Sequence, residues 1–340
     1  MKKFTHFTAL ILAFALLLSA CSGGAGSNGQ NASTPPGAEP AESSTIRIGF
    51  EGSLCQAPIV LAYLAGFFEA EGLDVQILVT GDLVNTRDAI AGGHIDAAAG
   101  MLSGWLIPLT QGIDLQFTLG LHTACASAFV LADSTTTAFL PGQNIAISGS
   151  IGGAFHNIGL RFLYQDGFSP DEFTWRDFPP AEAVIALQNG TVDVAVIPDH
   201  IGQRFVDEGL LRPIRSLTDP EFTQEACCVL GIAGPFLAQN PETSRKITQA
   251  VYSAARWMAD SPENTRAAMD LLIEHGYLNV DPEFAATLIG AWQWGLSNEQ
   301  TQATIFASIV EYQSLRLLPT TFAPADILEQ IWHPFDLAGE

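Results

Sequence analysis

Four cysteines and one histidine offer most of the chemistry in this chain. Cys55 stands alone, His122-Thr123-Ala124-Cys125 joins an imidazole to a thiol, and Cys227-Cys228 is a vicinal pair. In an oxidising compartment an even number of cysteines is typical of disulfides, and Cys55 to Cys125 is one example. A vicinal bond would be strained and reducible. Buried free thiols and a thiolate–imidazole site for a soft metal or metal complex stay open as alternatives.

The N-terminal segment predicts export. Two lysines precede an apolar run that ends at Leu18, and small residues lead from there to Cys21, which is typical of a secretory signal. Leu-Ser-Ala-Cys resembles the bacterial lipobox, which implies a signal peptide over residues 1–20 and lipidation of Cys21. Residues 21–44 are rich in Gly, Ser, Asn, Pro and Ala and predict a flexible tether. We expect a lipid-anchored protein at the cell membrane, facing the periplasm or the cell exterior.

Composition narrows the possible partners. The formal net charge is −22, and such an acidic surface repels nucleic acid and anionic lipid headgroups. No stretch after the signal is apolar for long enough to cross a bilayer. We therefore expect no nucleic-acid partner and contact with the membrane through the N-terminal lipid only.

An internal repeat predicts two lobes. Residues 48–54 align with residues 145–151, and residues 89–96 align with residues 186–193, both at an offset of 97. Each copy reads as a short apolar strand, a Gly-Ser turn, a helix, and later a second helix closed by Gly before another strand. Two βα lobes follow from this pattern.

The chain order assigns residues to the lobes. We expect lobe 1 over residues 45–130 and 228–340, with lobe 2 over residues 131–227 between them. Two hinge crossings are expected, near 126–132 and near 227–234. The C-terminal part reads as helical, with Ser261 as a helix N-cap, and is expected to pack on lobe 1.

Several motifs carry a family resemblance. The segments Ile46–Ala62 and Gly66–Val75, Asp88-Ala89-Ile90 with Gly93–Ala97, and Glu182–Leu187 with Gly190–Ala195 resemble solute-binding proteins of ABC importers. The group is that for nitrate, sulfonate and taurine, with relatives for thiamine-pyrimidine precursors (NMT1/THI5-like). The resemblance implies an α/β, type II periplasmic-binding-protein fold whose lobes close on a ligand. It also implies an ABC permease and its ATPase as partners.

The implied fold locates the ligand cleft. Ligands in open α/β sheets lie beyond the carboxyl ends of the strands, so the loops 51–58, 100–105, 148–155 and 198–202 should line it. The two crossings of such a fold run side by side, which should bring all four sulfurs and His122 to the cleft. The candidate ligand-binding residues are Glu51, Gly52, Ser53, Cys55, Gln56, Met101, Ser103, Trp105, His122, Cys125, Ser148, Ser150, Gly152, Asp199, Cys227 and Cys228.

The chemistry of these loops leaves the ligand open. The turns at Ser53 and Ser150 could direct N–H groups and hydroxyls at an anion, or could serve as turns and caps only. No basic residue lies in the four loops, while Glu51, Asp199 and neighbouring aromatic rings would suit a cationic or aromatic ligand.

The predicted function is capture of a small molecule, nitrate/sulfonate/taurine-like or pyrimidine-precursor-like, for an ABC importer. The alternatives are a thiol- and His-dependent binder of a soft metal or metal complex, and a pyrimidine-synthase-like enzyme. Such enzymes hold a phosphopyridoxal ring on a lysine, and Lys246 is the only lysine beyond the signal. We expect no enzyme, no cofactor, no metal in the main function, and a monomer.

Overall fold

The computed structural model describes residues 45–340. The predicted signal peptide, the tether and Cys21 lie outside the described residues. Within the described part, no helix is both long and apolar enough to cross a membrane.

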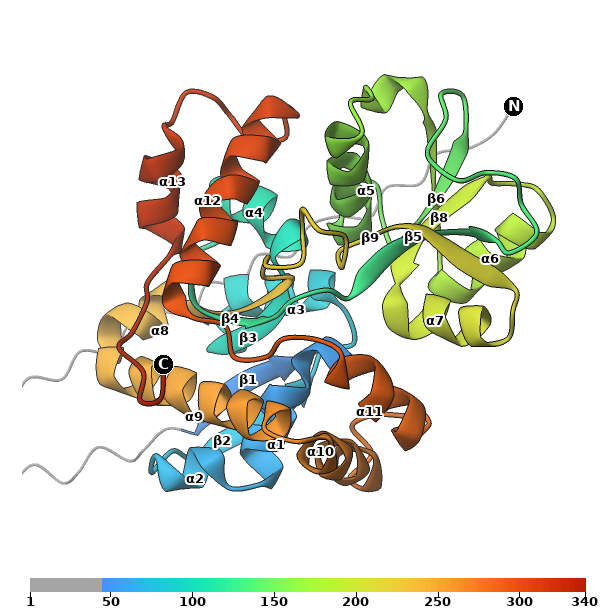
Figure 1. The fold of residues 1–340 in the computed structure, drawn as a ribbon. Coiled ribbons are helices and arrows are strands. Elements are labelled where there is room, and N and C mark those ends of the chain that lie inside the picture. Colours follow the sequence, from blue (N-terminus) through green and yellow to red (C-terminus); the bar gives the residue numbers. More distant parts are fainter. Residues whose placement is uncertain (1–44) are drawn as a thin grey trace, which may run out of the picture. The chain divides into compact units, whose positions relative to one another are not determined.

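The first sheet has the strand order β2-β1-β3-β10-β4 (Figure 1). Its strands are β1 (Ile46–Phe50), β2 (Val75–Val79), β3 (Ala97–Met101), β4 (Leu115–His122) and β10 (Cys228–Ala233). β1 pairs in parallel with β2 and β3, whereas β10 runs antiparallel to β3 and β4. Ala97 and Ala99 enter one hydrophobic cluster and Ala98 another. Both faces of the sheet are therefore covered, which explains its continuous apolar strands.

The second sheet repeats this plan in the order β7-β6-β8-β5-β9. Its strands are β5 (Ala126–Leu131), β6 (Asn144–Ser148), β7 (Thr174–Phe178), β8 (Val194–Pro198) and β9 (Leu211–Ser216). β6 pairs in parallel with β7 and β8, and β5 runs antiparallel to β8. β3 and β8 begin at Ala97 and Val194, which reproduces the offset of the sequence repeat. The predicted pair of βα lobes is confirmed.

The chain passes between the two sheets twice, slightly earlier than predicted. β4 belongs to the first sheet and β5 to the second, so the first passage consists of residues 123–125. Ala126–Leu131 cannot be a hinge because it is a paired strand. The return passage consists of residues 217–227, since Cys228–Ala233 is already strand β10.

Helices follow the strands in both lobes. In the first lobe these are η1 (Leu54–Gln56), α1 (Ala57–Leu64), α2 (Phe67–Ala70), α3 (Leu83–Ala91) and α4 (Leu102–Thr110). In the second they are α5 (Ala154–Gln165), η2 (Pro170–Glu172), α6 (Pro180–Gln188) and α7 (Asp199–Asp207). The sheet of the first lobe is buried against α1, whose residues from Ala57 to Ala62 are all buried.

The C-terminal helices pack on the first lobe, as predicted. They are α8 (Gly234–Gln239), α9 (Pro241–Ala259), α10 (Pro262–Glu274), α11 (Pro282–Gly290), α12 (Asn298–Ser314) and α13 (Pro324–Ile331). Figure 1 shows α9 and α10 beside α1, and α12 and α13 contact β4. The Ser261 side chain caps α10 by accepting from the Asn264 N–H at 3.1 Å.

The two lobes touch through α4 and α5. The Asn157 amide of α5 donates to the Ser103 carbonyl of α4 at 2.8 Å, and the Tyr312 hydroxyl of α12 donates to the same carbonyl at 3.1 Å. This contact lies at the carboxyl ends of β3 and β6, because α4 and α5 follow these strands.

Candidate functional site

A disulfide joins the two passages between the lobes. Cys125 of the first passage is bonded to Cys227 of the second, with 6.7 Å between their Cα atoms. The passages lie side by side, since the Cys227 N–H donates to the His122 carbonyl at 2.8 Å. The Cys55–Cys125 pairing given as an example is therefore wrong, and Cys227 does not bond to its neighbour Cys228.

Two free thiols lie beside this disulfide. Cys55 and Cys228 are buried and unbonded in the described part of the chain, and the sulfurs of Cys55, Cys125 and Cys228 lie within 4.8 Å of one another. Cys228 on β10 faces His122 on β4 across the sheet. Cys55 reaches them from η1, which Ser53 caps by accepting from the Cys55 N–H at 3.3 Å. The structure thus brings the four cysteines and His122 together.

His122 occupies an enclosed position in this group. Its side chain is fully buried, and its ring stacks on Trp292 at 4.8 Å and lies 4.6 Å from Trp294. Nδ1 lies 2.8 Å from the Thr123 carbonyl, while Nε2 has no hydrogen-bond partner. A buried nitrogen without a partner is rare and points to a ligand.

The two thiols have very different acidities. The hydrogen bond from the Cys228 thiol holds the pKa of Cys55 well below its ordinary value, and His122 lowers it further. Burial, followed by the hydrogen bond to Cys55 and its charge, raises the pKa of Cys228 well above the ordinary value. The pair therefore behaves as a Cys55 thiolate that accepts a hydrogen bond from the Cys228 thiol.

Two carboxyl groups adjoin the thiols. Burial raises the pKa of Asp199 to about 7, although the Ser127 hydroxyl donates to it at 2.7 Å. Burial and the negative charge of Cys55 raise the pKa of Glu51 to about 8, and Glu51 Oε1 has no partner. Near pH 7 both groups are protonated to a large extent and can donate hydrogen bonds.

A cavity of about 320 Å³ lies between the second lobe and the segment after α11. Ser127, Asp199 and Gln203 line it from one side, and Leu288 and Trp292 line it from the other. Because Asp199 also interacts with Cys55, the cavity and the thiol group are neighbours.

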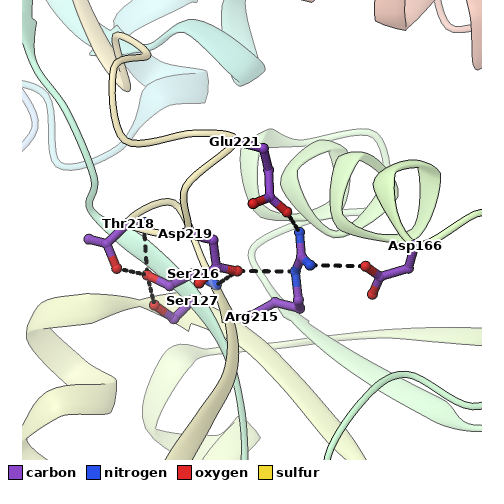
Figure 2. A network of polar contacts seen from close by, with 7 residues as sticks. All are labelled: Ser127, Asp166, Arg215, Ser216, Thr218, Asp219 and Glu221. Carbon is purple, nitrogen blue, oxygen red and sulfur yellow. Dashed lines mark hydrogen bonds and ion pairs between the residues drawn. The ribbon is translucent and has the colours of Figure 1, made fainter.

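Arg215 is the one basic residue that lines this cavity in the described part of the chain. Figure 2 shows its guanidinium surrounded by three carboxylates: Asp166 at 3.0 Å, Asp219 at 3.1 Å, and Glu221. In the same view, the Ser216 hydroxyl lies 3.0 Å from that of Ser127 and 2.8 Å from that of Thr218. Three carboxylates compensate the charge of this guanidinium, although its Nε makes no hydrogen bond. Little net positive charge is therefore left to attract an anionic ligand.

The other predicted site residues serve varied roles. Gln56 fixes the loop with two hydrogen bonds. Its Oε1 accepts from the Glu51 N–H and its Nε2 donates to the Ala99 carbonyl, both at 2.7 Å. Trp105 is 1% exposed and packs in the hydrophobic core behind the first sheet. Met101 faces Cys228 across the sheet. Ser148 ends β6, Ser150 lies in the turn that follows, and Gly52 and Gly152 adopt positive φ in their turns. Whether they contact a ligand stays a prediction.

Sequence reasoning missed Ser127, Gln203 and Trp292 as cavity residues. Ser127 is on β5, which was expected to be hinge, and Gln203 and Trp292 carry no motif. Only the approach of distant segments brings these three together.

Two sheets joined by two passages, with a cavity between the lobes, define a two-lobed binding-protein fold. The alkanesulfonate-binding protein SsuA of Xanthomonas axonopodis pv. citri, bound to MOPS, has the same fold, with a TM-score of 0.68. The match covers 87% of this chain and 100% of that chain at 18% identity. The predicted type II periplasmic-binding-protein fold is confirmed.

The chain belongs to the NMT1-like family, whose model matches residues 39–273. The bicarbonate transport ATP-binding protein CmpC of Synechocystis is 26% identical over 72% of this chain, which spans only 39% of CmpC. The riboflavin-binding protein RibY of Chloroflexus aurantiacus is 22% identical over 95% of both chains. The 4-amino-5-hydroxymethyl-2-methylpyrimidine phosphate synthase of Candida albicans is 23% identical over 66% of this chain and 69% of its own length. The predicted family resemblance is confirmed.

Proposed function

We propose that this protein is the extracytoplasmic solute-binding protein of an ABC importer and captures a small molecule in the cavity between its lobes. The observation that supports this best is the cavity itself, which is lined from both lobes by Ser127, Asp199 and Trp292. A ligand that contacts both sides favours the closed arrangement of the lobes by its additional contacts. The closed, loaded protein then docks on a permease with its ATPase.

Of the two ligand classes considered, the cavity chemistry favours a heteroaromatic, pyrimidine-precursor-like solute over nitrate, sulfonate or taurine. Asp199 with its raised pKa can donate to a ring nitrogen, and Trp292 offers an aromatic face. Arg215 is already held by three carboxylates, so an anion would find no free cation there. The riboflavin-binding and pyrimidine-synthase relatives support the same class, whereas the bicarbonate-transport relative and the alkanesulfonate-binding neighbour are named for anions.

Calorimetry on the purified protein tests the class, with riboflavin, 4-amino-5-hydroxymethyl-2-methylpyrimidine, nitrate and taurine as titrants. We expect one heteroaromatic compound to bind and Asp199→Ala to weaken binding by about 1–3 kcal/mol, because a buried hydrogen bond is lost. Asp88→Ala is the control, since Asp88 is exposed on α3. Binding of nitrate or taurine alone would overturn the ligand class.

Binding rather than catalysis is part of the proposal. A pyrimidine synthase of the kind described above requires a lysine for its phosphopyridoxal ring, and Lys246 lies on α9, which packs on α1 and α2. No lysine lines the described cavity. Incubation with pyridoxal phosphate should therefore leave no borohydride-stable adduct in the cavity.

Membrane anchoring through Cys21 completes the proposal. Cys21→Ser should leave the precursor uncleaved and without lipid, because the lipobox cysteine accepts the lipid. Incorporation of radioactive fatty acid into that variant at the wild-type level would contradict the anchor.

A further inference from the structure

The geometry of the thiol group suggests more than packing. His122 and Cys228 are direct partners across β4 and β10, so their side chains lie on one face of the sheet. Cys55 approaches that face from η1, and its sulfur lies within 4.8 Å of the Cys228 sulfur. Metal–thiolate bonds are about 2.3 Å long. One ion fits between these two sulfurs without a large movement of either.

His122 lies beside the two thiols and is not part of the ligand set. The donor atoms that lie within 4.8 Å of one another are the sulfurs of Cys55, Cys125 and Cys228, and no nitrogen of His122 belongs to this group. The Thr123 carbonyl can only accept a hydrogen bond, so Nδ1, at 2.8 Å from it, carries the ring proton. Nε2 is buried and has no hydrogen-bond partner.

We propose that Cys55 and Cys228 bind one soft d10 cation of the Cu(I) class. Two thiolate sulfurs are soft donors, which select Cu(I) over hard cations. Structural zinc takes four ligands almost without exception, whereas these residues supply two. The nearest further sulfur, that of Cys125, is already bonded to Cys227.

The charges around the site are compatible with a cation. The titratable neighbours are Glu51 and Asp199, which are acidic, and His200, which approaches Cys55 from α7. Trp292 and Trp294 enclose His122 and keep water away. Binding forms two metal–sulfur bonds and releases the Cys228 thiol proton to solvent, since Cys55 is already a thiolate. No electron is transferred and the Cys125–Cys227 disulfide stays intact.

This inference does not depend on the imported solute, so the two are tested separately. The full chain is titrated anaerobically with Cu(I) against a chromogenic Cu(I) chelator. We expect one ion per chain and X-ray absorption with two sulfur ligands. Wild-type protein that takes up no stoichiometric ion would overturn the site whatever the variants do.

Variants assign the ligands. Cys55→Ser or Cys228→Ser should abolish stoichiometric binding, whereas His122→Asn should keep one ion bound through two sulfur ligands. Cys21→Ser and the exposed His94→Asn are controls that should keep one ion at wild-type affinity. Equal affinity in Cys55→Ser would disprove the site, and tighter binding of Zn(II) than of Cu(I) would disprove the class of ion. Should a ligand variant fail to fold, the X-ray absorption spectrum of the wild type decides.

Discussion

Two buried polar clusters lie between the lobes, and they differ in how completely their groups are paired. In the first, Arg161 of α5 is ion-paired with Glu225 of the second passage at 2.6 Å and with Glu311 of α12. In the second, Cys55 and Cys228 lie beside His122, whose Nε2 has no hydrogen-bond partner. Arg161, Glu311 and the three residues of the second cluster are buried, and Glu225 is partly buried.

The difference between the two clusters distinguishes a structural role from a ligand-binding role. Burial lowers the pKa of Arg161, but Glu225 and Glu311 outweigh it and raise the pKa, so the charge is retained and compensated within the protein. A compensated cluster is complete without a ligand and holds the lobes together. The thiol–imidazole cluster is incomplete, because an unpaired buried group is costly unless something binds to it.

The largest effect should come from breaking the paired cluster. Arg161→Ala leaves the buried Glu311 and the partly buried Glu225 without their ion-pair partner, which should cost about 3–5 kcal/mol of unfolding free energy. Urea denaturation measures this. Arg245→Ala is the control, because Arg245 makes an exposed pair with Glu242 and should change little. A small effect for both variants would mean that the paired cluster does not stabilise the protein.

Removing the disulfide should rank second. The Cys125–Cys227 bond closes a loop of 102 residues, and its loss through Cys125→Ala with Cys227→Ala should cost about 2–4 kcal/mol. Peptide mapping without reduction should recover Cys125 linked to Cys227, with Cys55 and Cys228 open to alkylation. A peptide that links Cys55 to Cys125 would contradict the Cys125–Cys227 disulfide. Cys227 would then be a free thiol and would belong to the unpaired cluster.

The third effect should be a dependence of the unfolding free energy on pH, which comes from Asp199 beside the thiols. Burial raises the pKa of Asp199 to about 7 in the folded protein, against about 4 in the unfolded chain. The folded state therefore binds the proton more tightly, so this contribution is complete below pH 4 and is lost as pH rises through 7. Metal-free protein should lose on the order of 2 kcal/mol over this window, and Asp199→Asn should lose less. Asp88→Asn should follow the wild type; a wild-type curve that rises over the window would contradict the burial of Asp199.

The smallest effect belongs to the turn beside the thiols. Ser53→Ala removes the cap of η1 and should cost about 0.5–1 kcal/mol. Ser150→Ala is the matched control in the second lobe, because the Ser150 side chain is exposed and its carbonyl makes the turn contact to Gly153. Thermal unfolding of both variants measures the difference. Equal stability would show that the cap does not position Cys55.

Much of the fold could be predicted because it depends on local patterns. The repeat of strand, Gly-Ser turn and helix defined two lobes, and Ser261 with Pro262 marked the start of α10. The passages were predicted a few residues too late, since Ala126–Leu131 is apolar whether it is a hinge or a buried strand. Periodicity cannot distinguish these cases; strand pairing with β8 and β9 does.

The sequence by itself determined that four cysteines and His122 would meet near the cleft, because chain order and the two-lobed plan bring both passages to one place. It did not determine which sulfurs bond. That depends on a few ångströms between side chains 102 residues apart, and only the tertiary structure places Cys227 beside Cys125 while directing Cys228 toward Cys55. Adjacent residues on a strand point to opposite faces. At the start of β10, Cys227 therefore forms the structural disulfide, whereas Cys228 belongs to the candidate metal site.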